Sequence, residues 1–128
     1  MKLRILIVDD SETTRRILRA IVHSRDWTVC GEAETGQAGI EKFGELKPDL
    51  VLVDLAMPDM NGLEAARNMA ALDSRIPLIL FTVLDMPSLA EPARAAGISE
   101  VVSKAQAWDL VSTIERVVVN RLARDAAS

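Results

Sequence analysis

Polar and charged side chains follow several short apolar runs of this chain. They are the acidic pair Asp9 and Asp10, the carboxylate of Asp54, the hydroxyl of Thr82 and the amine of Lys104. The run Leu-Val-Leu-Val before Asp54 is typical of a strand that is buried on both faces of a sheet. Ligands of open α/β sheets bind in the crevice outside the carboxyl ends of the strands. We therefore expect these side chains to meet at one edge of a sheet.

The charges of this group indicate the chemistry that it could perform. Three carboxylates at one edge would repel one another and raise at least one pKa, unless a cation held them. Oxygen ligands favour Mg²⁺, which typically uses one or two carboxylates and keeps several waters. A lysine and a hydroxyl can bind the oxygens of a phosphoryl group. The set predicts metal-assisted phosphoryl transfer to an aspartate nucleophile.

The elements that must position these residues alternate between strand and helix. Strands are expected over 3–8, 27–33, 50–53 and 78–81 and around 101–102, and helices over 11–24, 36–46, 62–72 and 107–122. Ser11 and Asn61 are expected to cap the first and third of these helices. Strictly alternating elements predict an α/β fold, in which right-handed crossovers place helices on both faces of a parallel sheet.

Apolar residues at helical spacing predict the inward faces of the helices. In the first helix they are Ile17, Leu18, Ile21 and Val22. In the second they are Ala38, Ile40 or Phe43, and in the last they are Ala107, Leu110, Val111, Ile114, Val118 and Leu122.

The helix between the fourth and fifth strands is expected to be short. Pro92 stands inside this segment, and proline is tolerated in the first turn of a helix but disrupts its interior. We expect regular helix to begin near Glu91 or Pro92 and to stop at Gly97.

Composition narrows the class of protein. The chain has 128 residues, a net charge of −4 and a single cysteine, Cys30. This length suits one domain, which we assign to residues 1–122, with 123–128 as a tail or the start of a linker. No basic stripe suggests direct nucleic-acid binding, and no apolar run is long enough for a signal peptide or a membrane span. We expect a cytoplasmic protein without membrane contact.

The ordered motifs resemble the response-regulator receiver domain of two-component signalling. They are Asp9-Asp10, then Asp54 with Met57-Pro58 and Gly62, then Thr82, then Lys104. The resemblance covers essentially the whole chain. It implies a flavodoxin-like, doubly wound sheet of five strands in the order 2-1-3-4-5, flanked by five helices.

The resemblance also implies a role for each site residue. Asp54 would accept a phosphoryl group from a histidine kinase or a histidine phosphotransfer protein. Asp10 would bind Mg²⁺ directly, together with Asp54 and the backbone carbonyl of Ala56, and Asp9 would act largely through a water. Thr82 and Lys104 would contact the phosphoryl oxygens. The output surface would be the fourth helix, fifth strand and fifth helix, which would contact an output domain or partner protein.

The chain departs from the commoner pattern of the family at several positions. Ala105 stands where a cis proline commonly follows the lysine, so we expect a trans Lys104–Ala105 bond. Val101 replaces the usual aromatic residue, and it is too short to carry the switch by swinging inward. Polar side chains are frequent where this chain has Ala56 and Leu84, so we expect slow self-dephosphorylation.

Two rival functions remain open from the sequence. A haloacid-dehalogenase-type phosphatase needs a second aspartate two residues after the nucleophile as general acid, and Ala56 holds that place. A phosphorylation-independent interaction module would have lost a site residue, and none is missing. Arg15, Arg16 and Arg19 are interpreted as a solvated helix face, with contact to the phosphodonor as the alternative.

Overall fold

One parallel sheet forms the centre of the computed structural model, which describes residues 2–83 and 87–127. Its strands are β1 (Arg4–Val8), β2 (Thr28–Ala33), β3 (Leu50–Val53), β4 (Leu78–Thr82) and β5 (Glu100–Ser103). They pair in the order β2-β1-β3-β4-β5, and every neighbouring pair is parallel. The predicted α/β class and strand order are confirmed.

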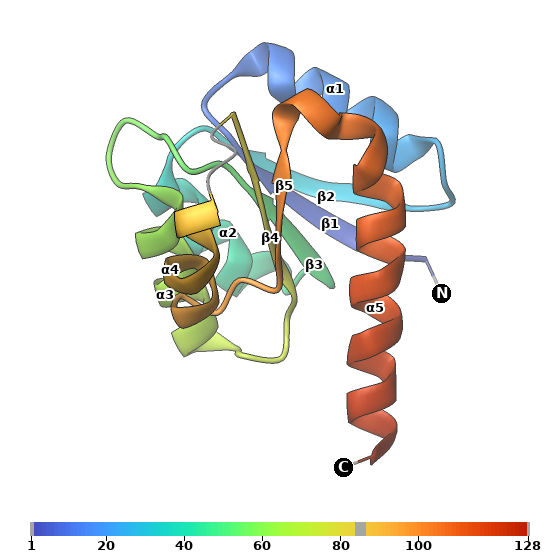
Figure 1. Cartoon of the computed structure of the whole chain (residues 1–128). Coiled ribbons are helices and arrows are strands. Elements are labelled where there is room, and N and C mark those ends of the chain that lie inside the picture. The colour runs from blue at the N-terminus through green and yellow to red at the C-terminus, as the bar shows by residue number, and fades with distance from the viewer. Residues whose placement is uncertain (1, 84–86, 128) are drawn as a thin grey trace.

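Helices cover both faces of this sheet. They are α1 (Glu12–His23), α2 (Gly36–Leu46), α3 (Gly62–Leu72), α4 (Ala90–Ala95) and α5 (Leu110–Ala127), with 3-10 turns η1 (Pro87–Leu89) and η2 (Lys104–Asp109). Figure 1 shows α2, α3 and α4 on one side of the sheet and α1 and α5 on the other. This arrangement leaves the carboxyl ends of the strands free to form a site.

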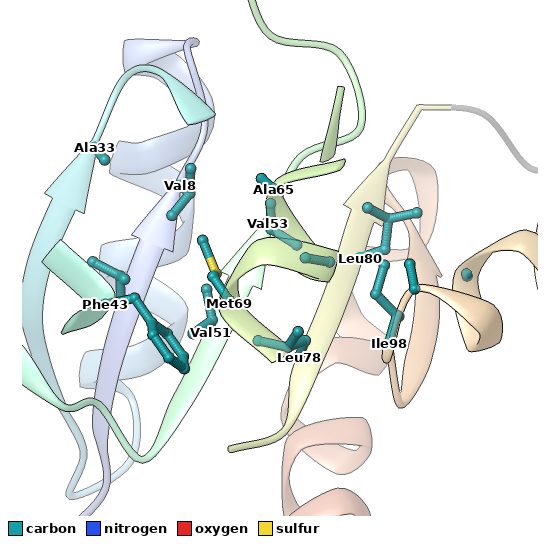
Figure 2. Close-up of a cluster of buried hydrophobic side chains, with 14 of the residues drawn as sticks. Val8, Ala33, Phe43, Val51, Val53, Ala65, Met69, Leu78, Leu80 and Ile98 are labelled. Atoms are coloured by element: carbon teal, nitrogen blue, oxygen red, sulfur yellow. The ribbon is translucent and has the colours of Figure 1, made fainter. Parts of the chain in front are cut away.

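Two apolar clusters hold the three layers together. Along β1, Leu6 and Val8 join the cluster that contains Met69 of α3, shown in Figure 2. Ile5 points to the opposite face and joins the cluster that contains Ile114 of α5. All four residues of β3 are buried, because the central position of this strand places helices over both of its faces.

The predicted helix caps are present. The Ser11 hydroxyl accepts a hydrogen bond from the Thr14 amide at 3.2 Å, and the Asn61 side chain accepts one from the Glu64 amide at 2.9 Å. Each cap satisfies an amide that has no partner within its helix, and so fixes where α1 and α3 begin. α1 therefore starts three residues after Asp9, and α3 starts eight residues after Asp54.

The short α4 is confirmed, with Pro92 in its first turn, where a missing amide costs least. The helix stops before Gly97, whose φ of 90° is a conformation that favours glycine. Leu84 and its two following neighbours lie outside the described residues.

The last helix differs from the expectation. Residues 104–109 form the 3-10 turn η2, because Gln106 has non-helical angles, so α5 begins at Leu110 rather than Ala107. α5 then continues to Ala127, and in Figure 1 its end projects beyond the sheet. Leu122 is therefore exposed, contrary to its predicted place in the core. The assignment of 123–128 to a tail or linker outside the domain stays a prediction.

The inward face of α1 also differs. Ile17 is 47% exposed, whereas Leu18 and Val22 are buried as predicted, and Arg15 occupies the remaining inward position of the helix.

Across 2–83 and 87–127, no helix combines the length and apolar character that a membrane crossing requires.

The outer strand β2 pairs irregularly with β1. Its register with β1 shifts between Ile5 and Leu6, so the pairing skips Cys30. The Nζ atom of Lys42 on α2 donates a hydrogen bond to the carbonyl of Glu32. The lysine therefore satisfies a backbone carbonyl on the side of β2 that has no neighbouring strand.

Candidate functional site

The carboxyl edge of the sheet gathers the residues that the sequence singled out. Asp9 follows β1, Asp54 follows β3, Thr82 ends β4 and Lys104 follows β5. Asp9, Asp54 and Thr82 are buried, with 1%, 6% and 1% of their surfaces exposed. Asp10 belongs to the same edge but is exposed.

The three carboxylates form one cluster. Asp9, Asp10 and Asp54 each offer an oxygen atom, and these oxygens all lie within 4.8 Å of one another. β1 and β3 are adjacent in the sheet, and Asp9 and Asp54 each follow the last residue of their strand, which places them side by side. The sequence prediction that these side chains meet is confirmed.

Lys104 supplies the positive charge of the cluster. Its Nζ atom lies 3.0 Å from Asp9 Oδ2 and 3.4 Å from Asp54 Oδ1. The Ser103 hydroxyl accepts a hydrogen bond from the Ala105 amide, and this cap fixes the chain on either side of the lysine. No cis peptide bond occurs in the described part of the chain, so the trans Lys104–Ala105 bond is confirmed.

The electrostatics of Asp54 reflect this crowding. Burial raises the pKa of its carboxyl, and the neighbouring negative charge of Asp9 raises that pKa further. Lys104 acts in the opposite direction and lowers the pKa, but the combined shift remains upward. A second positive charge in the cluster would therefore stabilise the ionised form of Asp54.

The cluster fits a hard divalent cation such as Mg²⁺. Asp9 Oδ1 accepts a hydrogen bond from the Ser11 amide at 2.9 Å, but Asp9 Oδ2 is buried without a hydrogen-bond partner among the described residues. Lys104 Nζ is close to Oδ2, yet the contact pairs the charges without hydrogen-bond geometry. A buried, unsatisfied oxygen beside two further carboxylates matches the oxygen ligands that Mg²⁺ prefers.

The loop after β3 is anchored at both ends. The Gly62 amide donates to the Leu55 carbonyl at 2.7 Å, and a Cβ at Gly62 would lie 2.1 Å from the Asp54 carbonyl oxygen. Only glycine allows α3 to approach Asp54 this closely. Ala56 lies within the loop, exposed, two residues after Asp54.

Asp59 connects the same loop to α2. Its two carboxylate oxygens accept hydrogen bonds from the Gly36 and Gln37 amides, each at 2.9 Å. The amides of Gln37 and Gly36 lower the pKa of the Asp59 carboxyl. No local sequence pattern predicts this contact, because the partners are more than twenty residues apart in the chain.

Thr82 reaches the site from the adjacent strand. It is the last residue of β4 and pairs in register with Ser103, the residue before Lys104. Its side chain is thus positioned by the same strand pair that places the lysine.

Arg15 is the residue that the sequence interpretation placed wrongly. Its side chain is only 7% exposed, although we expected it on a solvated face. It follows the inward spacing of α1, three residues before Leu18 and seven before Val22, and that spacing was the available signal. Arg19, by contrast, keeps about a third of its side chain exposed, at 33%.

The strand order and the site define a doubly wound α/β domain that carries an aspartate cluster at the carboxyl edge of its parallel sheet. The chain belongs to the response regulator receiver domain family, whose model matches residues 5–115. The match spans all five strands and every site residue named above.

Relatives include stand-alone and larger proteins. The chain is 35% identical over 101 residues to a chemotaxis protein CheY of Thermotoga maritima, and the match covers 79% of this chain and 84% of that protein. It is 39% identical over 84 residues to a protein-glutamate methylesterase/protein-glutamine glutaminase of Trichodesmium erythraeum, covering 65% of this chain but only 24% of that protein.

Solved structures agree with the fold. A two-component response regulator of the LuxR family from Aurantimonas superposes with a TM-score of 0.90 at 30% identity, covering 94% of this chain and 88% of that one. The response regulator domain of Thermotoga maritima CheB gives 0.84 at 28% identity, with 92% and 97% covered.

Proposed function

We propose that this chain is a phosphoacceptor receiver, in which Asp54 takes a phosphoryl group from a phosphohistidine of a histidine kinase or a histidine phosphotransfer protein. The observation that carries the proposal is the position of the Asp54 carboxylate, buried between two acidic neighbours and Lys104.

The transfer requires little covalent chemistry from the protein. A carboxylate oxygen of Asp54 bonds to phosphorus as the P–N bond of the donor breaks, and the electron pair of that bond returns to the imidazole nitrogen. Lys104 Nζ, already 3.4 Å from Asp54 Oδ1, binds a phosphoryl oxygen, and the Thr82 hydroxyl binds another. Asp54, Asp10 and the Ala56 carbonyl would hold Mg²⁺, with Asp9 acting largely through a water. When bound, Mg²⁺ neutralises the charge that gathers on the phosphoryl oxygens.

The product of the proposed transfer is the phosphorylated protein itself, and phosphate is not rapidly released from it. Ala56 offers no side chain that could act as general acid two residues after Asp54, so rapid phosphatase turnover is disfavoured. Self-dephosphorylation is expected to be slow. We assign the chain no enzymatic role beyond its own phosphorylation and dephosphorylation.

The proposed output passes through α4, β5 and α5 to an output domain or a partner protein. A groove between these elements is lined by residues that include Val101, Gln106 and Ser112. Direct nucleic-acid binding and membrane contact form no part of the proposal, and a cytoplasmic location stays a prediction.

Incubation with acetyl phosphate and Mg²⁺, followed by intact mass measurement, tests the proposal. A receiver gains one phosphoryl group per chain, and Asp54→Asn gains none. Continuous release of phosphate would indicate a phosphatase. An unmodified wild-type chain would indicate an interaction module that has lost the switch.

A further inference from the structure

Arg15 is a buried charge that phosphoryl transfer does not use. A guanidinium removed from water is costly unless every donor is paired. Each nitrogen of the Arg15 guanidinium has a partner, and the partners come from three segments: the Asp9 carbonyl after β1, Glu12 on α1, and Glu32 in β2 with Glu34 just after it. These partners restrict the guanidinium to one orientation.

The bond to Asp9 is the shortest link from this network to the acidic cluster. Arg15 Nη1 donates to the Asp9 main-chain carbonyl at 2.7 Å, and the contact is buried. This carbonyl belongs to the peptide between Asp9 and Asp10. That peptide is planar, so its orientation sets the position of the Asp10 Cα atom, from which the carboxylate extends.

The other parts of this turn are held separately. The Asp9 amide donates to the Ala33 carbonyl at 3.0 Å, and Asp9 Oδ1 accepts from the Ser11 amide. The Asp10 carboxylate is exposed. Its position therefore depends on the peptide that Arg15 holds rather than on packing around its own side chain.

The surrounding carboxylates also make Arg15 compatible with a cation nearby. An unpaired guanidinium this close to the cluster would oppose a divalent ion. Glu12 and Glu32 bind both Arg15 and Arg19, and Glu34 binds Arg15 at 3.3 Å. Three carboxylates thus balance two guanidinium groups, and the network adds no net positive charge at the site.

We propose that Arg15 is a positioning residue for the divalent-cation site, which it serves by fixing the Asp9–Asp10 peptide so that the Asp10 carboxylate faces the cluster. The inference rests on the proposed function, because it assumes that the cluster binds Mg²⁺. Arg19 provides a matched comparison, since it shares Glu12 and Glu32 with Arg15 but has no bond to the Asp9 carbonyl.

The test is a titration of the full chain with MgCl₂, followed by the amide NMR signals around the acidic pair and by calorimetry. Loss of a residue that orients a metal ligand typically lowers metal affinity by about 10–100-fold. We expect Arg15→Met to raise the Mg²⁺ dissociation constant at least tenfold, and Arg19→Met to change it less than twofold. Arg15→Lys keeps the charge without the planar fork and should recover part of the affinity.

A second measurement separates positioning from general damage. The rate of phosphorylation by acetyl phosphate in Arg15→Met should return to within twofold of wild type when Mg²⁺ is saturating, because Asp54 and Lys104 are unchanged. Should Arg15→Met not fold, the same comparison is made between Arg15→Lys and Arg19→Lys, with a several-fold loss of affinity expected only for the former.

Equal Mg²⁺ affinity in wild type and the folded Arg15 variant would overturn the inference, as would an equal loss in the matched Arg19 variant. A wild-type chain that binds no Mg²⁺ would instead overturn the proposed function, and the inference with it.

Discussion

Asp54 is held in an environment that opposes its own ionisation. Burial and the charge of Asp9 raise the pKa of its carboxyl, and Lys104 offsets only part of this effect. The nucleophile must nevertheless be ionised to attack phosphorus. Function at this residue is therefore obtained at the expense of stability, as is common in sites that gather like charges.

Asp54→Asn should abolish phosphorylation and stabilise the protein without metal by about 1 kcal/mol at neutral pH, because it removes a crowded buried charge. Since the folded-state pKa of Asp54 is raised, its contribution favours folding at low pH and is lost as pH rises through that pKa. The advantage of the variant should therefore shrink as pH falls. Urea unfolding at a series of pH values measures the difference in unfolding free energy between variant and wild type. A variant less stable than wild type at neutral pH would contradict the expectation.

Lys104 should compete with the metal for the same carboxylates. Its Nζ atom lies 3.0 Å from Asp9 and 3.4 Å from Asp54, so a divalent cation must share these partners with it. We expect Lys104→Met to bind Mg²⁺ several-fold more tightly yet to be phosphorylated more slowly, because a binding group for the phosphoryl oxygens is lost. Calorimetry and acetyl phosphate labelling provide the two readouts, and weaker Mg²⁺ binding would show that the lysine does not compete.

At the scale of elements, Asp59 fastens the loop after β3 to the beginning of α2. The carboxylate satisfies the first two amides of that helix, where α-helices have unpaired donors. The loop between Asp54 and α3 is thus held at two points, by the first two amides of α2 at Asp59 and by the Gly62 amide of α3 at the Leu55 carbonyl.

Asp59→Asn should weaken this connection, because an amide nitrogen would face a backbone donor. The pKa of Asp59 is lowered in the folded state, so its contribution to stability is present above the unfolded pKa and is lost as pH falls through the folded value. The difference in unfolding free energy between wild type and variant should therefore vanish in acid. Glu45→Gln, at an exposed position of α2, serves as the control and should show no such trend.

The elements differ in how well the sequence predicts them. Ser11 and Asn61 mark their helices correctly, because a cap bonds an amide three residues away and the signal is local. The predicted start of α5 was wrong, because Gln106 has non-helical backbone angles, and the periodicity of apolar residues does not report such angles.

The site likewise contains residues that the sequence predicts and one that it does not. Its residues were predicted because each ends or closely follows a strand, and parallel strands end at one edge. Arg15 was misplaced because its burial depends on Glu32 and Glu34, which the fold brings beside α1 from a separate strand. Partners of this kind are set by the tertiary arrangement, and charge alone predicts a solvent-exposed position.

At the scale of the whole molecule, one side of α5 is available for a partner. Trp108, just before the helix, is 74% exposed, and Ser112, Glu115 and Val119 continue along the same side. Val101 on β5 is 36% exposed and lines the neighbouring groove. The predicted output surface therefore has an apolar side chain at two of its elements.

Phosphorylation should alter this surface through backbone changes, because Val101 is too short to report the switch. From the sequence we hypothesise that phosphorylation reorders residues 83–91, because Pro87 and Pro92 prevent a long helix there; residues 84–86 lie outside the described part of the chain. We expect beryllofluoride with Mg²⁺ to change hydrogen exchange in 87–95 and 100–112, and Asp54→Asn to show no change. Altered protection confined to 9–12 and 54–62 would mean that the signal does not reach this surface.

The two outer strands of the sheet are not equally protected against strand addition from another molecule. On β2, the skipped residue Cys30 breaks the regular row of backbone groups, and Lys42 occupies the outward carbonyl of Glu32. Bulges and lysines at a sheet edge both discourage edge-to-edge aggregation. β5 has neither device in its register with β4, and its protection comes from its length of four residues. Self-association by strand addition, where conditions favour it, is therefore directed to the β5 edge, the edge that also borders the proposed output surface.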